Sequence, residues 1–205
     1  MNIIDTFSSN SLKVLEKDKN EFINKYVYSL SIFKKDNRTL LGQKFHSLIC
    51  AHIKGFDVSK MLLDLDKNEL IYWKNLSEKL KDIKNNFIKT EYSFLIKENS
   101  NSSTTPYFYL TGRFDAIYKD ENGFIIYDWK TSSLPKNPAQ DLQSVVYLYA
   151  LSKIFKNEFE ENSKINAKIR YLSIEKMETV DVCFKNPDEY KKRITSIISK
   201  LDWYN

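Results

Sequence analysis

Hydrophobic and polar positions divide the chain into a first part with helical spacing and a second part rich in strand-forming residues. In residues 11–30, apolar residues recur at steps of three and four, which is typical of one amphipathic helix or two short ones. The same spacing predicts helices over residues 39–54 and 57–63. Asp66 is a favourable N-cap for a longer helix that ends near residue 85. We therefore expect a helical N-terminal part, from residue 1 to about residue 85.

The pattern changes at Phe87, where β-branched and aromatic residues become frequent. Three antiparallel strands are expected, over residues 87–97, 107–118 and 124–130. They are followed by a helix, two further strands and a last helix, over residues 139–155, 165–174, 179–184 and 188–201. This order predicts an α/β fold with a mixed central β-sheet flanked by helices. No internal repeat or linker marks a second domain, so we expect residues 1–205 to form a single domain.

Composition and charge exclude several kinds of protein. The chain has four glycines, too few and too dispersed for a glycine-rich dinucleotide turn or phosphate loop. Its two cysteines, Cys50 and Cys183, cannot supply a four-cysteine zinc site or iron–sulfur cluster. Any metal must therefore be held mainly by oxygen ligands, with or without a histidine. The net charge of +5 permits an anionic partner.

The sequence favours a cytoplasmic protein with no membrane span. Two cysteines far apart in the chain fit a reducing compartment. The first nine residues lack the basic segment and apolar run of a signal peptide. The longest uncharged apolar stretch, residues 142–152, is much shorter than the roughly 20 residues that cross a bilayer.

Candidate chemistry is concentrated in two stretches, Gly112-Arg113-Phe114-Asp115 and Asp128-Trp129-Lys130. Because side chains alternate along a strand, Asp128 and Lys130 point to one face. If Asp115 and Asp128 converge, a divalent cation such as Mg²⁺ is the simplest way to relieve their repulsion. Such a cation polarises a phosphoryl oxygen and activates a water, which Lys130 could orient. A surface hairpin with a solvated ion pair, and Asp115 capping a turn, is the structural alternative.

Gln143 and Tyr147 lie four residues apart on the predicted helix that follows, so they share one face and could overhang the carboxylates. The amide of Gln143 can contact a water or a phosphate. Tyr147 can donate to a phosphate oxygen or stack on a base. Tyr147 also fits the apolar stripe of the same helix, so packing in the core is an alternative for this residue.

Four motifs occur in an order that resembles the RecB-type branch of the PD-(D/E)XK nuclease superfamily, which includes CRISPR-associated exonucleases. The motifs are G-x-x-x-H, G-x-x-D, (D/E)-x-K and Q-x-x-x-Y, at Gly42 to His46, Gly112 to Asp115, Asp128 to Lys130 and Gln143 to Tyr147. They span residues 39–149. The resemblance implies a restriction-endonuclease-like core.

The resemblance also implies roles for individual residues. Its metal ligands would be His46, Asp115, Asp128 and the carbonyl of Trp129. Lys130 would be the catalytic lysine, and the catalytic set would be completed by Gln143 and Tyr147.

Two further residues are interpreted through the same resemblance. Glu91 matches an acidic position that precedes G-x-x-D in relatives, so it would support the metal or a water. A salt bridge on an edge strand explains Glu91 equally well. His52 falls outside the motif, and we expect it at the surface or at a helix end.

The activity implied by the resemblance is a Mg²⁺- or Mn²⁺-dependent DNA nuclease, an exonuclease that acts on DNA ends in recombination, repair, or phage or CRISPR-type DNA processing. Basic residues would bind the DNA backbone, among them Arg113, Lys136 and Lys153. No helicase motif is present, so unwinding would require a helicase or recombination partner from another chain.

The cysteines depart from the pattern of many relatives, which carry four cysteines around an iron–sulfur cluster. Cys50 and Cys183 match no such set, and we expect no iron–sulfur cluster. Hydrophobic packing would then tie the N-terminal helices to the C-terminal part, with Trp203 and Tyr204 as candidates.

Two other hypotheses are compatible with the sequence. One is a catalytically inactive nuclease-fold module that binds DNA or a protein partner. The other is a small-molecule enzyme or structural protein in which the motifs occur by chance. The last hypothesis predicts that the motif residues do not converge in space.

Overall fold

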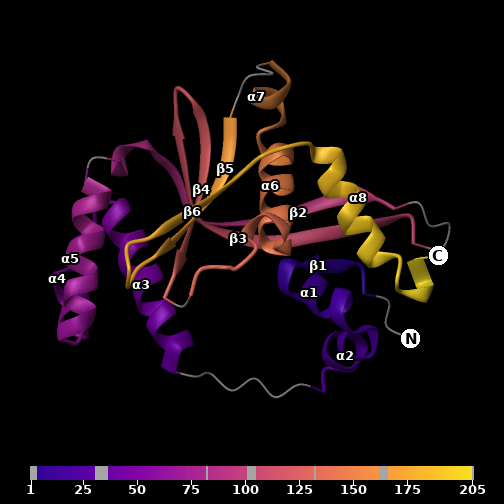
Figure 1. The fold of residues 1–205 in the computed structure, drawn as a ribbon, viewed down its shortest axis with the longest axis horizontal. Coiled ribbons are helices and arrows are strands. Elements are labelled where there is room, and N and C mark those ends of the chain that lie inside the picture. The colour runs from indigo at the N-terminus through magenta and orange to yellow at the C-terminus, as the bar shows by residue number, and fades with distance from the viewer. Residues whose placement is uncertain are drawn as a thin grey trace.

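A six-stranded mixed β-sheet forms the centre of the fold in the computed structural model, which describes residues 4–30, 37–81, 83–100, 105–131, 133–161 and 166–204 (Figure 1). The strands are β1 (Thr6–Ser8), β2 (Phe87–Asn99), β3 (Tyr107–Asp120), β4 (Gly123–Lys130), β5 (Asn166–Ser173) and β6 (Thr179–Cys183). Their order is β1-β3-β4-β5-β6. β1 and β4 pair with different segments of β3, and β2 pairs along its length on the opposite edge. β1 with β3 and β4 with β5 are parallel, whereas the other pairs are antiparallel. The predicted α/β fold with a mixed sheet is confirmed.

Helices lie on both faces of this sheet. They are α1 (Ser9–Lys17), α2 (Lys19–Phe22), α3 (Asn37–Ile53), α4 (Ser59–Leu62), α5 (Lys67–Lys81), α6 (Leu142–Ile154), α7 (Lys156–Glu161) and α8 (Pro187–Ile198). Short π- or 3₁₀-helical turns occupy Ile23–Val27, Lys84–Asn86, Pro138–Gln140 and Asp202–Tyr204. In the part of the chain that the structure describes, no helix is both long and apolar enough to span a bilayer.

Each face of the sheet has its own apolar cluster. α1, α6 and α8 pack on one face, against buried strand residues such as Phe108 and Phe114. α3 and α5 pack on the other face, against Tyr127 and Trp129. Figure 1 shows α3, α4 and α5 gathered at one end of the molecule and α6 and α8 towards the other. Ten of the residues of α6 are buried, which explains why its sequence is apolar all round.

The predicted elements agree with the structure to within a few residues, with two differences. Residues 11–30 form short helices, one of the two expected alternatives, because the Asp18 side chain accepts hydrogen bonds from the N–H groups of Asn20 and Glu21 and starts α2 anew. The helix predicted from residue 139 begins at Leu142, because Asp141 is its N-cap. The short strand β1 and the separate helix α7 were not predicted.

The N-terminal helices are tied to the C-terminal part by packing and polar contacts, as expected. Leu12 of α1 and Ile194 of α8 belong to one buried cluster. Trp203 packs against this cluster, and its indole N–H donates to the carbonyl of Ile4 at 3.4 Å. The side chain of Tyr204 lies outside the described residues.

Candidate metal centre

β3 and β4 separate where the predicted acidic residues lie. Their pairing ends at Ala116 and Tyr127, so Asp115 and Asp128 follow on strand segments that are no longer bonded to each other. β4 nevertheless continues along β5 to Lys130. The edge of β4 that β3 leaves open is therefore available to side chains.

The backbone of Trp129 is bonded by two predicted site residues instead of by a strand. Its N–H donates to Asp115 Oδ2 at 2.8 Å. Its carbonyl oxygen lies 3.1 Å from His46 Nε2, which reaches it from α3. The side chains of Asp115 and His46 are thus held by the N–H and the carbonyl of Trp129, which have no strand partner on the β3 side.

Glu91 and Asp115 lie at an irregular step shared by β2 and β3. Glu91 has a φ of 50°, in the left-handed region that non-glycine residues rarely adopt. On β3, Phe114 belongs to one apolar cluster and Ala116 to the cluster on the other face, so the alternation of side chains breaks at Asp115.

This step turns two carboxylates towards the ring of His46. Asp115 Oδ1 lies 3.2 Å and Glu91 Oε1 3.7 Å from His46 Nδ1. One ligand atom from each of the three residues lies within 4.8 Å of the others, a grouping that could hold a metal ion. The step therefore assembles the first half of the candidate centre.

Asp128, Lys130 and Gln143 form the second half. The Lys130 ammonium lies 2.6 Å from Asp128 Oδ2, so the prediction that both point to one face is confirmed. The Gln143 amide donates to Asp128 Oδ1 at 2.6 Å, and Lys130 donates to Gln143 Oε1 at 3.1 Å. The Asp141 cap places Gln143 in the first turn of α6, directly over the end of β4.

Burial and charge set the protonation of these groups. Burial and the negative charge of Asp115 raise the pKa of Asp128, against the opposing charges of Lys130 and His46. Burial lowers the pKa of His46, but Asp115, Glu91 and the Trp129 carbonyl together raise it above its ordinary value. The centre thus concentrates negative charge beneath partly exposed side chains, since His46, Glu91 and Lys130 keep about a quarter of their surface accessible.

The donor set fits a hard divalent cation. Carboxylate and carbonyl oxygens are ligands that suit Mg²⁺ and Mn²⁺, and in this set they outnumber the single imidazole nitrogen. Asp128 Oδ2 is buried and accepts no hydrogen bond of good geometry from the described residues, although Lys130 is its ion-pair partner. Asp128 lies outside the group formed by His46, Glu91 and Asp115, so its predicted role as a ligand stays a prediction.

Arg113 and Tyr147 flank the centre. Arg113 Nη1 lies 3.0 Å from Glu91 Oε2, and the side chain is 58% exposed. The salt bridge expected as an alternative for Glu91 is therefore present. Tyr147 is buried with its ring edge-to-face on Phe114, and its hydroxyl donates to the Arg113 carbonyl at 2.8 Å. In this structure Tyr147 fixes the β3 backbone, as its place in the apolar stripe suggested.

The other predicted residues lie at different distances from the centre. Lys136 is exposed in the segment that joins β4 to α6. Lys153 lies near the far end of α6 and pairs with Glu98 at 3.1 Å, so it does not join the carboxylates of the candidate metal centre. His52 lies in the last turn of α3, so the expectation of a helix-end position is confirmed. Its ring is half-buried against Trp73, and its Nε2 is inaccessible.

Two glycines contribute to the site in ways that the sequence analysis missed. A Cβ on Gly42 would lie 3.3 Å from Thr131 Oγ1, so the glycine lets α3 pass close to the end of β4 and bring His46 to it. A Cβ on Gly112 would lie 2.6 Å from Phe94 Cζ. The signal was present in the motifs, because each glycine precedes a predicted ligand by three or four residues.

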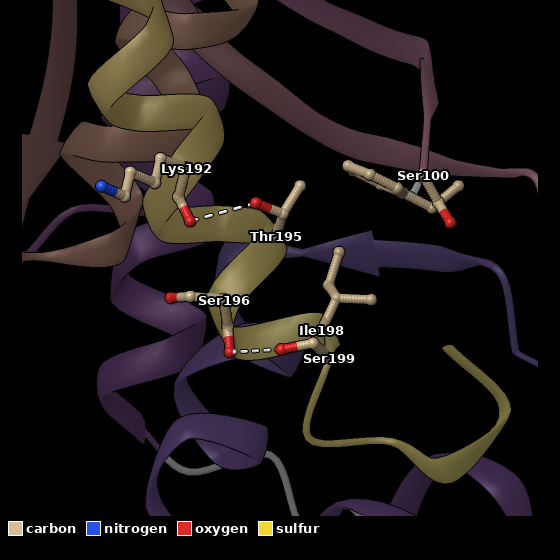
Figure 2. A pocket seen from close by; sticks show the side chains of 7 residues that line it. Ser100, Lys192, Thr195, Ser196, Ile198 and Ser199 are labelled. Carbon is tan, nitrogen blue, oxygen red and sulfur yellow. Dashed lines mark hydrogen bonds between the residues drawn. The ribbon is translucent and has the colours of Figure 1, made fainter. Parts of the chain in front are cut away.

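The hollow in Figure 2 lies elsewhere, along α8. It has a volume of about 240 Å³ and is lined by residues that include Ser100, Phe108 and Thr195. The Thr195 and Ser199 hydroxyls donate to carbonyls of the same helix rather than into the hollow. No predicted site residue lines it.

Comparison with known proteins agrees with this geometry. The model of the PD-(D/E)XK nuclease superfamily matches residues 6–201. The chain belongs to the PD-(D/E)XK nuclease superfamily. The chain is 28% identical over 189 residues to the RecBCD enzyme subunit RecB of Borreliella burgdorferi (strain ATCC 35210 / DSM 4680 / CIP 102532 / B31), a match that covers 77% of this chain and 16% of RecB. It therefore spans less than a fifth of the length of that relative.

A solved structure supports the fold. The crystal structure of a presumed exonuclease from Eubacterium rectale superposes with a TM-score of 0.55 at 8% sequence identity. The match covers 96% of this chain and 79% of the Eubacterium rectale chain. At this identity the likeness shows a shared fold, as expected for a restriction-endonuclease-like core.

Proposed function

We propose that this nuclease is a Mg²⁺- or Mn²⁺-dependent deoxyribonuclease that acts on DNA ends. The observation that carries the proposal is the convergence of His46, Glu91 and Asp115 beside the Asp128–Lys130 pair. The superfamily supplies the nuclease chemistry, and this convergence identifies the residues that would perform it.

The roles of the residues follow from their contacts. His46, Asp115, Asp128 and the Trp129 carbonyl would hold the cation, and Glu91 would support it. When bound, the cation would supply a Lewis acid for the phosphoryl oxygen and lower the pKa of water. Lys130 is placed to orient the attacking water and to neutralise charge that develops on the phosphate. Asp128 and Gln143 hold the Lys130 ammonium in place through the contacts described above.

The finer parts of the proposal rest on the relatives. Action on DNA ends is supported by the exonuclease description of the structural relative and by the Q-x-x-x-Y resemblance. A partner on another chain is supported by the match to a subunit of the RecBCD enzyme. A place in DNA recombination or repair, with a helicase as that partner, is supported by the resemblance of the motifs. Retention of Lys130 and of a complete donor set favours an active enzyme over an inactive DNA-binding module.

Cleavage of three DNA forms tests the proposal. The purified protein is incubated with labelled single-stranded, linear duplex and closed circular DNA, with Mg²⁺, Mn²⁺ or EDTA. We expect degradation of the linear forms with metal only, and a loss of at least about 100-fold in Lys130→Ala and Asp115→Asn. Lys67→Ala, an exposed lysine on α5, is the matched control.

The other outcomes are also informative. Cutting of closed circles would make the protein an endonuclease. Cleavage that persists in both variants would place the reaction outside this centre. DNA that is retained but never cut, with any metal, would support the inactive binding module instead.

A further inference from the structure

The outer half of the β2–β3 pair carries aromatic and basic side chains on an open face. Phe94, Phe108 and Leu110 are buried on the face that α6 and α8 cover. Because side chains alternate along a strand, the opposite face presents Leu95, Lys97, Tyr107 and Tyr109. Leu95 is 63% and Tyr107 37% exposed. Figure 1 shows that α3 and α5, which cover this face near the metal centre, lie away from the outer half.

We infer that this strip, defined by Lys97, Tyr107, Tyr109 and Arg113, binds a single strand of DNA and leads it to the candidate metal centre. The inference deepens the proposed function, because it takes DNA as the substrate and adds the form in which the DNA reaches the site.

The strip has the chemistry that a single strand requires. The Lys97 ammonium lies 4.0 Å from the centroid of the Tyr107 ring, and the Tyr107 and Tyr109 rings lie 5.7 Å apart. Aromatic faces stack on bases, and adjacent cations contact the phosphates. The acidic Asp5 also lies close by on the β1 side, where it accepts a hydrogen bond from the Thr6 hydroxyl.

The strip is continuous with the metal centre along β3. Arg113 lies on the same face and reaches Glu91 at 3.0 Å, so a basic group stands between the tyrosines and the carboxylates. The eight steps from Tyr107 to Asp115 span about 26 Å at about 3.3 Å per residue. This length suits on the order of four nucleotides, the lower end for grooves that bind single strands.

The same features disfavour a duplex on this strip. A base stacks on a tyrosine only if one of its faces is free, and neighbouring base pairs cover these faces in a double helix. The exposed side chain of Leu95 adds apolar contact, which suits bases rather than the phosphates that a duplex presents.

Fluorescence anisotropy in EDTA measures binding without turnover. The probes are a labelled oligothymidylate of about 12 nucleotides, an abasic strand of equal length and a hairpin duplex. We expect the wild type to prefer oligothymidylate, and the double variant Tyr107→Ala, Tyr109→Ala to lose about 10-fold or more in affinity. The matching double phenylalanine variant keeps the rings and should bind like the wild type. Phe56→Ala removes an exposed aromatic ring elsewhere and is the control.

Two further measurements separate stacking from a general loss of structure. The wild type should bind the abasic strand more weakly than oligothymidylate. The alanine variant should bind the two probes with equal, weak affinity. Lys97→Glu alters an exposed side chain that forms no part of the core, so it keeps the test available if the tyrosine variants misfold. It should weaken binding and reduce the salt dependence by about one phosphate contact.

The inference and the proposed function can fail separately. The inference would be wrong if the alanine and Lys97→Glu variants bound oligothymidylate as tightly as the wild type. It would also be wrong if Phe56→Ala lost as much affinity as they do. Binding that depends on the tyrosines, without cleavage with any metal, would support the strip and contradict the nuclease proposal. Cleavage of single strands that requires Lys130 but is unchanged in the tyrosine variants would support the nuclease proposal and contradict the strip.

Discussion

At the scale of single residues, Gln143 occupies the central position of the candidate centre. Its amide N–H bonds one oxygen of Asp128, and its amide oxygen accepts from Lys130. A glutamine is suited to this place because it is both donor and acceptor, whereas a carboxylate would add charge beside a buried carboxylate. Gln143 thus acts through the two residues that it positions.

Gln143→Ala should therefore lower the cleavage rate by about 10- to 100-fold, the range for residues that orient the groups at a metal centre. The rate is measured on labelled linear DNA at saturating Mn²⁺, with Gln140→Ala, an exposed residue just before α6, as the control. A rate equal to wild type would show that Lys130 is held without the amide.

The candidate site residues could be named from the sequence, but their geometry could not. The alternation rule placed Asp128 and Lys130 together because it depends on one strand alone. The left-handed backbone of Glu91 has no signal in its neighbours, since it arises from a step shared by two strands. The helix-end position of His52 followed from the pattern of one helix, but its contact with Trp73 depends on another helix and could not be predicted from it.

At the scale of elements, Glu98 joins the end of β2 to two helices. Its side chain is only 7% exposed, and it pairs with Lys153 of α6 and Lys191 of α8 at 3.1 and 2.8 Å. Burial raises the pKa of Glu98, but the ammonium groups of Lys191 and Lys153 outweigh it and lower the pKa overall. The ionised carboxylate therefore stabilises the packing of α6 and α8 on the sheet.

Glu98→Gln should destabilise the protein by about 1–3 kcal/mol at neutral pH, because a charge-assisted network is lost. Since the folded pKa lies below the unfolded value of about 4.3, this stability is present above that value and is lost as the pH falls through the folded pKa. Urea midpoints between neutral and acid pH test this. The difference from wild type should shrink in acid, whereas Glu175→Gln, an exposed control, should show no such trend.

Most elements followed from local pattern, and the exceptions are instructive. β1 has three residues and gains its pairing from Tyr109–Thr111, about one hundred residues later in the chain, so its own sequence carries almost no strand signal. The start of α6 was displaced because Pro138 opens a 3₁₀ turn and Asp141, a strong N-cap, follows it.

At the scale of the whole molecule, the two ends of the described chain stabilise each other. Leu12 of α1 and Leu201 after α8 are both fully buried in one cluster. Lys19 pairs with Asp202 at 2.7 Å, and Lys200 donates to the carbonyl of Glu16. The N-terminal helices and α8 should consequently unfold as one unit with the sheet.

Leu201→Ala should cost about 2–4 kcal/mol of unfolding free energy, because it leaves a cavity at a fully buried site. Urea denaturation followed by far-ultraviolet circular dichroism measures the loss. Leu63→Ala, at a position that is 83% exposed, should change the midpoint little. Two separate transitions in the Leu201 variant would contradict the single unit.

The irregular step at Glu91 and Asp115 also constrains how such chains can change during evolution. On β2 the adjacent Thr90 and Glu91 both face α3, and on β3 Asp115 and Ala116 do the same. Losing one residue from either strand alone would turn every side chain of its outer half to the opposite face. Insertions and deletions in the two strands should therefore occur together among descendants of this chain. A chimera of two relatives should likewise exchange both strands on the same side of the step.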